Sequence, residues 1–177
     1  MKIIEDKNFL DIAQKQAMEN YLFSPEFPYY YQPGTVDGDE HKRDILSHVV
    51  IKRIEERKSK NDNGYNSKSV SFFVDLLKNF CKKHKIKYKN ILRCAVNLSY
   101  NNGYDSCEKH TDHDILHKQL IVFLNDCDKN ACLFIKNNKN FVKIKPEKYK
   151  GVCFDGQQHY FKFPKSKIRL VVVYTFR

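Results

Sequence analysis

Residues 151–176 read GVCFDGQQHYFKFPKSKIRLVVVYTF and contain three short runs rich in apolar, β-branched and aromatic residues. Four further runs of this kind lie between residue 90 and this stretch. Short strands at such spacing, separated by turns, are typical of a β-sandwich or barrel. The seven predicted strands cover residues 91–98, 120–124, 132–135, 141–144, 152–154, 160–163 and 168–176.

The chain before residue 90 has a different pattern. Apolar residues recur at three- and four-residue steps over 6–22 and 69–84, which predicts two amphipathic helices. Residues 45–54 fit a strand or a short helix, and a strand is favoured. We find no repeat and no low-complexity linker. The sequence therefore predicts one α+β domain over residues 1–177, with a mainly helical half (1–89) supporting a β half (90–177).

Composition narrows the class of protein. Hydrophobic residues make up 41% of the 177 residues, enough for one well-buried core. The formal net charge of +11 admits a nucleic-acid partner, but Lys far outnumbers Arg, the residue favoured for phosphate forks and base edges. No apolar run approaches the roughly 20 residues of a membrane span. With no readable secretory signal, we expect the six cysteines to be free thiols in the cytoplasm or another intracellular reducing compartment.

A metal-ligand pattern lies in the β half. His110-Thr111-Asp112 places an imidazole and a carboxylate two positions apart, and His159 follows 47 residues after Asp112. Residues i and i+2 of an extended chain face the same side, so His110 and Asp112 can reach one ion. Two His and one carboxylate are the ligand set of non-haem Fe(II) oxygenases. An ordinary solvated loop is the alternative for residues 108–114.

Arg169 adds a second signal, ten residues after His159. It lies in the run IRLVVV of residues 168–173, and a buried Arg is costly unless its charge is paired. A dicarboxylate cosubstrate would supply that partner through a two-pronged contact. Together, His159 and Arg169 at these spacings disfavour the loop alternative.

The set His110-x-Asp112, His159 and Arg169 resembles the Fe(II)/2-oxoglutarate-dependent dioxygenases, in particular the small prolyl-hydroxylase-like and viral or phage-type members. The resemblance is strongest over residues 90–177, and it implies a double-stranded β-helix core, also called a jelly roll. It further implies that His110, Asp112 and His159 bind Fe(II), and that O2 and 2-oxoglutarate are consumed. Arg169 would bind the distal carboxylate of 2-oxoglutarate.

Three local matches support the resemblance. Tyr100 lies ten residues before His110, where prolyl-hydroxylase-like members place a Tyr on that same distal carboxylate. Leu124-Asn125 resembles the end of the family's "YLN" strand, and residues 151–156 resemble the strand before the distal His. Asn97 and Tyr100 should face opposite sides of one strand unless the strand ends between them, so both cannot be assigned to the site.

The implied activity is hydroxylation of a C–H bond with release of succinate and CO2. The positions of Tyr100 and Arg169 favour a protein or peptide side chain as the substrate. One alternative is a nucleic-acid demethylase or hydroxylase of the same superfamily. Those enzymes carry a second Arg six residues after the cosubstrate Arg, where this chain has Thr175. The other alternative is a β-helix module that binds a partner without turnover, which the intact ligand set disfavours.

Some polar residues near the pattern keep open roles. His113 and His117 are four residues apart and could bind a metal on a helix, but a loop position near the site is favoured. Arg93 could be a structural ion-pair partner. The sequence makes no prediction of the oligomeric state.

Overall fold

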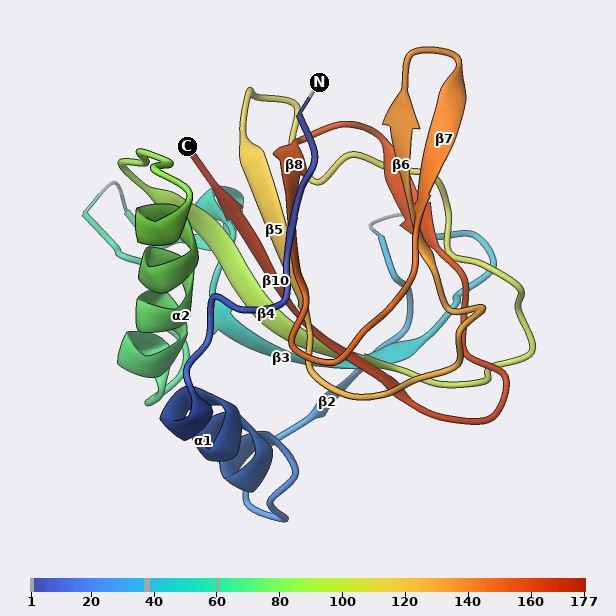
Figure 1. Ribbon diagram of the computed structural model, residues 1–177, viewed down its shortest axis with the longest axis horizontal. Coiled ribbons are helices and arrows are strands. Elements are labelled where there is room, and N and C mark those ends of the chain that lie inside the picture. Colours follow the sequence, from blue (N-terminus) through green and yellow to red (C-terminus); the bar gives the residue numbers. More distant parts are fainter. Residues whose placement is uncertain (1, 37–38, 60) are drawn as a thin grey trace.

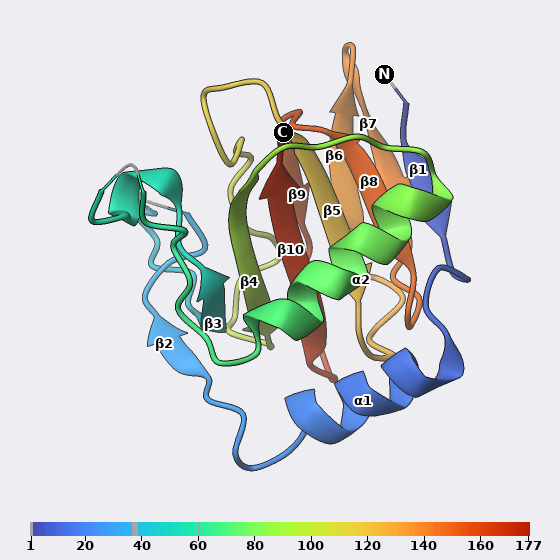
Figure 2. The ribbon, with the colours of Figure 1, turned by 90° about the vertical axis from the view of Figure 1, so that its left-hand side faces the viewer.

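Two β-sheets lie against each other, and two helices cover the outer face of the larger one (Figures 1 and 2). The computed structural model describes residues 2–36, 39–59 and 61–177, which form ten strands and two α-helices. The large sheet has the order β1-β8-β5-β10-β4-β3-β2, and the small sheet has the order β7-β6-β9. The helices are α1 (Ile12–Leu22) and α2 (Val70–Lys83), and the strands are β1 (Ile4–Asp6), β2 (Tyr30–Gln32), β3 (Ile45–Ile51), β4 (Ile91–Ser99), β5 (Lys118–Phe123), β6 (Leu133–Asn137), β7 (Asn140–Ile144), β8 (Gly151–Asp155), β9 (His159–Phe161) and β10 (Arg169–Phe176).

Strand β10 lies at the centre of the large sheet and is buried on both faces. Its even-numbered residues, such as Leu170 and Val172, pack in the core beneath the helices. Its odd-numbered residues, such as Val171 and Val173, pack in a second core shared with β6 of the small sheet. A strand covered on both faces has apolar residues at consecutive positions, which explains the uninterrupted run in the sequence.

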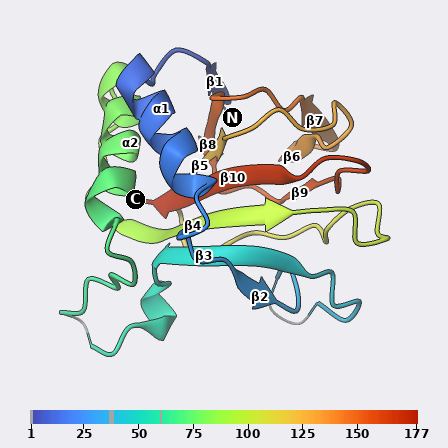
Figure 3. The ribbon, with the colours of Figure 1, turned by 90° about the horizontal axis from the view of Figure 1, so that it is seen from below.

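Helix α2 lies across the outer face of the large sheet (Figure 2). Phe73, Leu77 and Phe80 are fully buried on it, and the Tyr174 hydroxyl donates a hydrogen bond to the Phe73 carbonyl oxygen over 2.9 Å. This contact fixes the helix against β10. Figure 3 shows both helices at one side of the large sheet. The opposite face packs against the small sheet and lines the cavity between the two sheets.

The first 89 residues are less helical than the sequence predicts. β1 pairs with β8, β3 pairs with β4 and β2 pairs with β3, so this half adds three strands to the large sheet. The first helix begins at Ile12 rather than near residue 6, because the Asp11 carboxylate caps it by accepting from the Gln14 backbone N–H over 2.7 Å. β1 and β2 have three residues each, too few for an alternating pattern to show.

The remaining fold predictions agree with the structure. All seven strands of the β half are present, and the favoured strand assignment at residues 45–54 is confirmed by β3. The cysteines are free and five of the six are buried. Within the described part of the chain, every helix is too short or too polar to cross a bilayer.

Candidate metal centre

A cavity between the two sheets contains four of the five predicted site residues. Inward-facing residues of the large sheet line one wall, and residues of β6 and β9 in the small sheet line the other. His110, Asp112, His159 and Arg169 all face this cavity, whereas Tyr100 does not line it.

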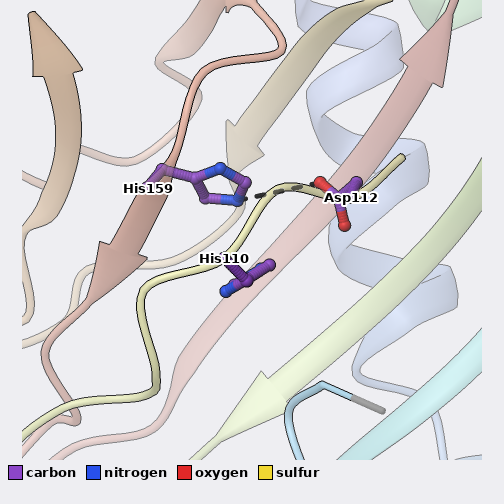
Figure 4. A group of neighbouring side chains, drawn as sticks. All are labelled: His110, Asp112 and His159. Carbon is purple, nitrogen blue, oxygen red and sulfur yellow. Dashed lines mark ion pairs between the residues drawn. The ribbon is translucent and has the colours of Figure 1, made fainter. Parts of the chain in front are cut away.

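The backbone brings His110 next to His159. The two residues form an isolated antiparallel bridge, in which the His110 N–H donates to the His159 carbonyl over 3.0 Å and the His159 N–H donates back over 2.8 Å. Their ring centroids are 4.5 Å apart. One donor atom from each of His110, Asp112 and His159 lies within 4.8 Å of the other two (Figure 4). Residues 47 positions apart in the sequence therefore form one metal-ligand group.

Backbone carbonyls orient both imidazole rings. The His110 Nδ1 lies 2.8 Å from the Glu108 carbonyl oxygen, and the His159 Nδ1 lies 3.0 Å from that of Gln157. Since a carbonyl can only accept, each Nδ1 carries a proton, and Nε2 is the ring nitrogen left for a metal. Burial lowers the pKa of His159 to about 4, so its ring is neutral near pH 7. Both rings are thus ready to bind a metal through Nε2.

Asp112 completes the group with a buried carboxylate. Its Oδ2 lies 3.7 Å from the His159 Nε2, the pair joined by the dashed line in Figure 4, and has no hydrogen-bond partner among the described residues. Arg53 donates to the Asp112 backbone carbonyl over 2.6 Å and lies 3.7 Å from Oδ1. Burial by itself raises the pKa of Asp112, but the nearby His159, His110 and arginines outweigh it and lower this pKa to about 2. The carboxylate is therefore ionised at neutral pH.

Arg169 is buried in the same cavity, and its Nε has no hydrogen-bond partner among the described residues. The guanidinium carbon lies 4.4 Å from the centroid of the Phe161 ring and 5.3 Å from that of Phe123, so aromatic faces replace a counter-ion. Burial lowers the pKa of Arg169 to about 10, which leaves it charged at neutral pH. A buried unpaired cation of this kind favours an anionic ligand.

Tyr100 lies outside the site, contrary to the role that the resemblance implies. β4 ends at Ser99, and Asn97 and Ser99 both line the cavity, so the next side chain points away from it. The Tyr100 hydroxyl donates instead to the Asp44 carboxylate. The alternation rule thus selects Asn97, whose Oδ1 accepts a hydrogen bond from the Ser47 hydroxyl over 2.8 Å.

His113 and His117 lie in a loop, as favoured from the sequence. The His113 Nε2 is 2.8 Å from the Thr175 Oγ1, and the His117 Nδ1 is 2.8 Å from the Ile115 carbonyl oxygen. The metal-ligand group that the described residues form includes neither ring. The His113 contact joins the segment between Asp112 and β5 to β10, whereas the His117 contact stays within that segment.

A buried ion pair supports His110 from the side. The Arg43 guanidinium donates to both carboxylate oxygens of Asp39 and also contacts the Glu108 carboxylate. Asp39 in turn accepts from the backbone N–H of Thr35, a residue of the cavity wall. Because Glu108 also supplies the carbonyl that orients His110, this network ties the wall to the metal-ligand segment.

The sequence interpretation missed Gln119 and left Arg93 open, although both line the cavity. Gln119 is fully buried and its Nε2 lies 3.3 Å from the His159 Nε2. One signal could have found it: a Gln at an inward-facing position of a strand whose other inward residues, Ile121 and Phe123, are apolar.

Comparison with solved structures places this arrangement in a known fold. An oxidoreductase of the 2OG-Fe(II) oxygenase family from Burkholderia pseudomallei superposes with a TM-score of 0.73 at 14% identity, over 98% of this chain and 84% of that one. The chain has the fold of the 2OG-Fe(II) oxygenases. The double-stranded β-helix expected from the resemblance is thereby confirmed.

Prolyl hydroxylases are among the other structures with the 2OG-Fe(II) oxygenase fold. The viral collagen prolyl hydroxylase of Paramecium bursaria Chlorella virus-1, solved with 2OG, matches with a TM-score of 0.60 at 14% identity, over 100% of this chain and 96% of that one. A Trichoplax adhaerens prolyl hydroxylase, solved with a hypoxia inducible factor peptide fragment, matches with a TM-score of 0.64 at 15% identity, over 98% of this chain and 82% of that one. No protein-family model and no curated protein matches the sequence.

Proposed function

We propose that residues 1–177 form one Fe(II)- and 2-oxoglutarate-dependent dioxygenase domain that hydroxylates a C–H bond, with a protein or peptide side chain as the substrate. One observation carries the proposal: a single cavity holds a His-Asp-His metal-ligand group together with a buried guanidinium that has no counter-ion among the described residues. The first feature suits Fe(II), and the second suits a carboxylate.

The residues present fit the metal. Both His110 and His159 have their Nδ1 occupied by a backbone carbonyl, and the Asp112 Oδ2 is buried without a partner. His110, Asp112 and His159 would hold the ion through two nitrogens and one oxygen, a set that leaves further positions open for small ligands. When bound, Fe(II) and 2-oxoglutarate would supply the oxidation, in which O2 converts C–H to C–OH and 2-oxoglutarate to succinate and CO2.

The chain's own residues bind and orient the cosubstrate. Arg169 would bind the distal carboxylate in a two-pronged contact, and the rings of Phe123 and Phe161 beside it keep water away from that ion pair. Val171 and Val173 line the cavity further along β10 and offer an apolar surface for the methylene groups. The protein thus contributes position and a dry environment.

The peptide substrate rests on the fold comparison. The Trichoplax adhaerens enzyme of this fold was solved with a peptide fragment, and several structural neighbours are prolyl hydroxylases. We also propose an intracellular reducing compartment, which the six free thiols support.

Succinate release is the test of this activity. Purified protein with Fe(II), 2-oxoglutarate and O2 is incubated with panels of proline-containing peptides, oligonucleotides and free amino acids, and an Asp112→Ala variant serves as the inactive control. We expect succinate formation above the uncoupled rate with peptides, in equal amount to a product 16 mass units heavier than the peptide, the mass of one oxygen atom. If only oligonucleotides stimulate succinate formation, and this stimulation falls steeply as the salt concentration rises, the substrate is nucleic acid instead of peptide.

A further inference from the structure

A row of three polar residues crosses the large sheet beside the cavity. Arg93 of β4 pairs directly with Thr175 of β10, which pairs on its other side with Gln119 of β5. Arg93 and Gln119 both line the cavity. Arg169 lies six residues from Thr175 on β10, roughly 20 Å along the strand. The guanidinium groups of Arg93 and Arg169 therefore lie at two different positions along the strands that line the cavity.

Arg93 has no counter-ion among the residues that the structure describes. The described residues include no hydrogen-bond or ion-pair partner for its guanidinium, and Asp112 and Glu56 act on it only at longer range. Arg53 is a second cation nearby, and it already donates to the Asp112 carbonyl. Burial and the charge of Arg53 lower the pKa of Arg93.

The proposed function leaves this charge unmatched. The two charges of Fe²⁺ and the charge of Arg169 are balanced by Asp112 and the two carboxylates of 2-oxoglutarate. Nothing in that set neutralises Arg93. An unpaired cation that lines a cavity favours an anionic partner, and a charged group of the substrate would supply one.

Gln119 provides a second, independent observation. It is 1% exposed, and its Oε1 has no hydrogen-bond partner among the described residues. Its Nε2 contacts the lone pair of the His159 Nε2, the atom that a metal would take. With metal bound, the whole amide group is free, and its buried oxygen requires a donor.

Resting on the proposed function, we infer that Arg93 binds a carboxylate of the peptide substrate, and that Gln119 Oε1 accepts an N–H of the same substrate. One guanidinium fork matches the two oxygens and the single charge of a carboxylate. Inorganic phosphate or a phosphate monoester has at least three acceptor oxygens and up to two charges, which one guanidinium does not neutralise. The substrate is therefore an acidic peptide whose carboxylate lies close to the oxidised carbon.

The six arginines of the chain allow a direct test by NMR. Protein labelled with [¹⁵N]arginine is loaded with Zn²⁺ and 2-oxoglutarate, and its six Nε–H signals are assigned by single Arg→Lys variants. Acetate, acetamide and inorganic phosphate are then added in turn as probes. We expect acetate to shift the Arg93 signal saturably and at least tenfold more tightly than acetamide, while the exposed Arg177 serves as the internal control.

The outcomes separate this inference from the proposed function. If 2-oxoglutarate shifts the Arg93 signal and leaves Arg169 unmoved, Arg93 holds the cosubstrate and the inference is wrong. An Arg93 signal that ignores acetate, or that responds at least tenfold more tightly to phosphate, also overturns it. If 2-oxoglutarate moves neither signal, the proposed function fails, whereas a saturable acetate shift at Arg93 still supports the anion site.

A peptide assay gives a second readout. Pairs of peptides that differ by Glu against Gln, or Asp against Asn, are compared for succinate release by the wild type, Arg93→Gln and the control Arg177→Gln. We expect at least a tenfold preference for the acidic peptide in the wild type and in Arg177→Gln, and its loss in Arg93→Gln. An equal preference in all three proteins contradicts the inference.

Discussion

We expect that replacing Asp112 with alanine lowers the affinity for Fe(II) by more than about a hundredfold. The basis is that losing even a group that supports a metal ligand typically costs 10–100-fold in affinity, and Asp112 supplies the ligand atom itself. Without this carboxylate, His110 and His159 remain as two neutral donors. Titration with Mn²⁺, followed by electron paramagnetic resonance, measures the change without exposure of iron to oxygen.

The control for this experiment is Asp105→Ala. Asp105 is an exposed aspartate that pairs with Lys162 on the surface. Its replacement should leave the Mn²⁺ affinity unchanged. Circular dichroism establishes that both variants are folded. A folded Asp112→Ala protein that binds Mn²⁺ as tightly as the wild type would show that the metal does not use this group.

We expect that replacing Arg169 with methionine raises the Kd for 2-oxoglutarate about a hundredfold. Truncating one partner of a buried, hydrogen-bonded charge pair costs about 2–5 kcal/mol, and each 1.4 kcal/mol is a factor of ten. Calorimetric titration of the Zn²⁺-loaded protein measures the affinity without turnover. The metal affinity itself should be unchanged, since Arg169 is not part of the metal-ligand group.

The same substitution has an unusual expected effect on stability. In the protein without ligands, the Arg169 guanidinium is buried without a counter-ion among the described residues, and burial lowers its pKa to about 10. Methionine removes this charge while filling much of the space beside Phe161, so the melting temperature should stay equal or rise. Arg177→Met is the matched exposed control. A large fall in stability with unchanged 2-oxoglutarate affinity would mean that Arg169 has a structural role.

Much of the site could be predicted from the sequence because its signals are local. In any extended chain, the spacing in His110-x-Asp112 places both side chains on the same side. An Arg within an apolar strand indicates a buried charge whatever the topology. The pairing of His110 with His159 could not be derived, because it depends on a bridge between segments far apart in the chain. The resemblance to a family supplied that step.

Two expectations failed for physical reasons. The resemblance places Tyr100 on the cosubstrate from its spacing to His110, but β4 ends one residue earlier with Ser99 facing the cavity, and Tyr100 donates to Asp44 instead. The sequence predicts a mainly helical structure for the first 89 residues because the two helices have long periodic patterns. The strands β1 and β2 acquire their structure from pairing with β8 and β3, which no local pattern records.

The residue at one position argues against a nucleic-acid substrate. Thr175 stands where the superfamily's nucleic-acid enzymes carry a second Arg, and its hydroxyl is engaged by His113. Arg93 of β4 pairs with Thr175 of β10, so a guanidinium lies beside this position but comes from the neighbouring strand. The acetate and phosphate titrations above decide which anion this guanidinium binds.

The most direct test of the central claim is the absorption spectrum of the protein with Fe(II) and 2-oxoglutarate in the absence of oxygen. Chelation of the iron by 2-oxoglutarate at His110, Asp112 and His159 predicts a weak visible charge-transfer band in the green. This band should saturate at one 2-oxoglutarate per iron and be absent from Asp112→Ala. A wild-type sample in which iron is bound and 2-oxoglutarate produces no band would contradict the account.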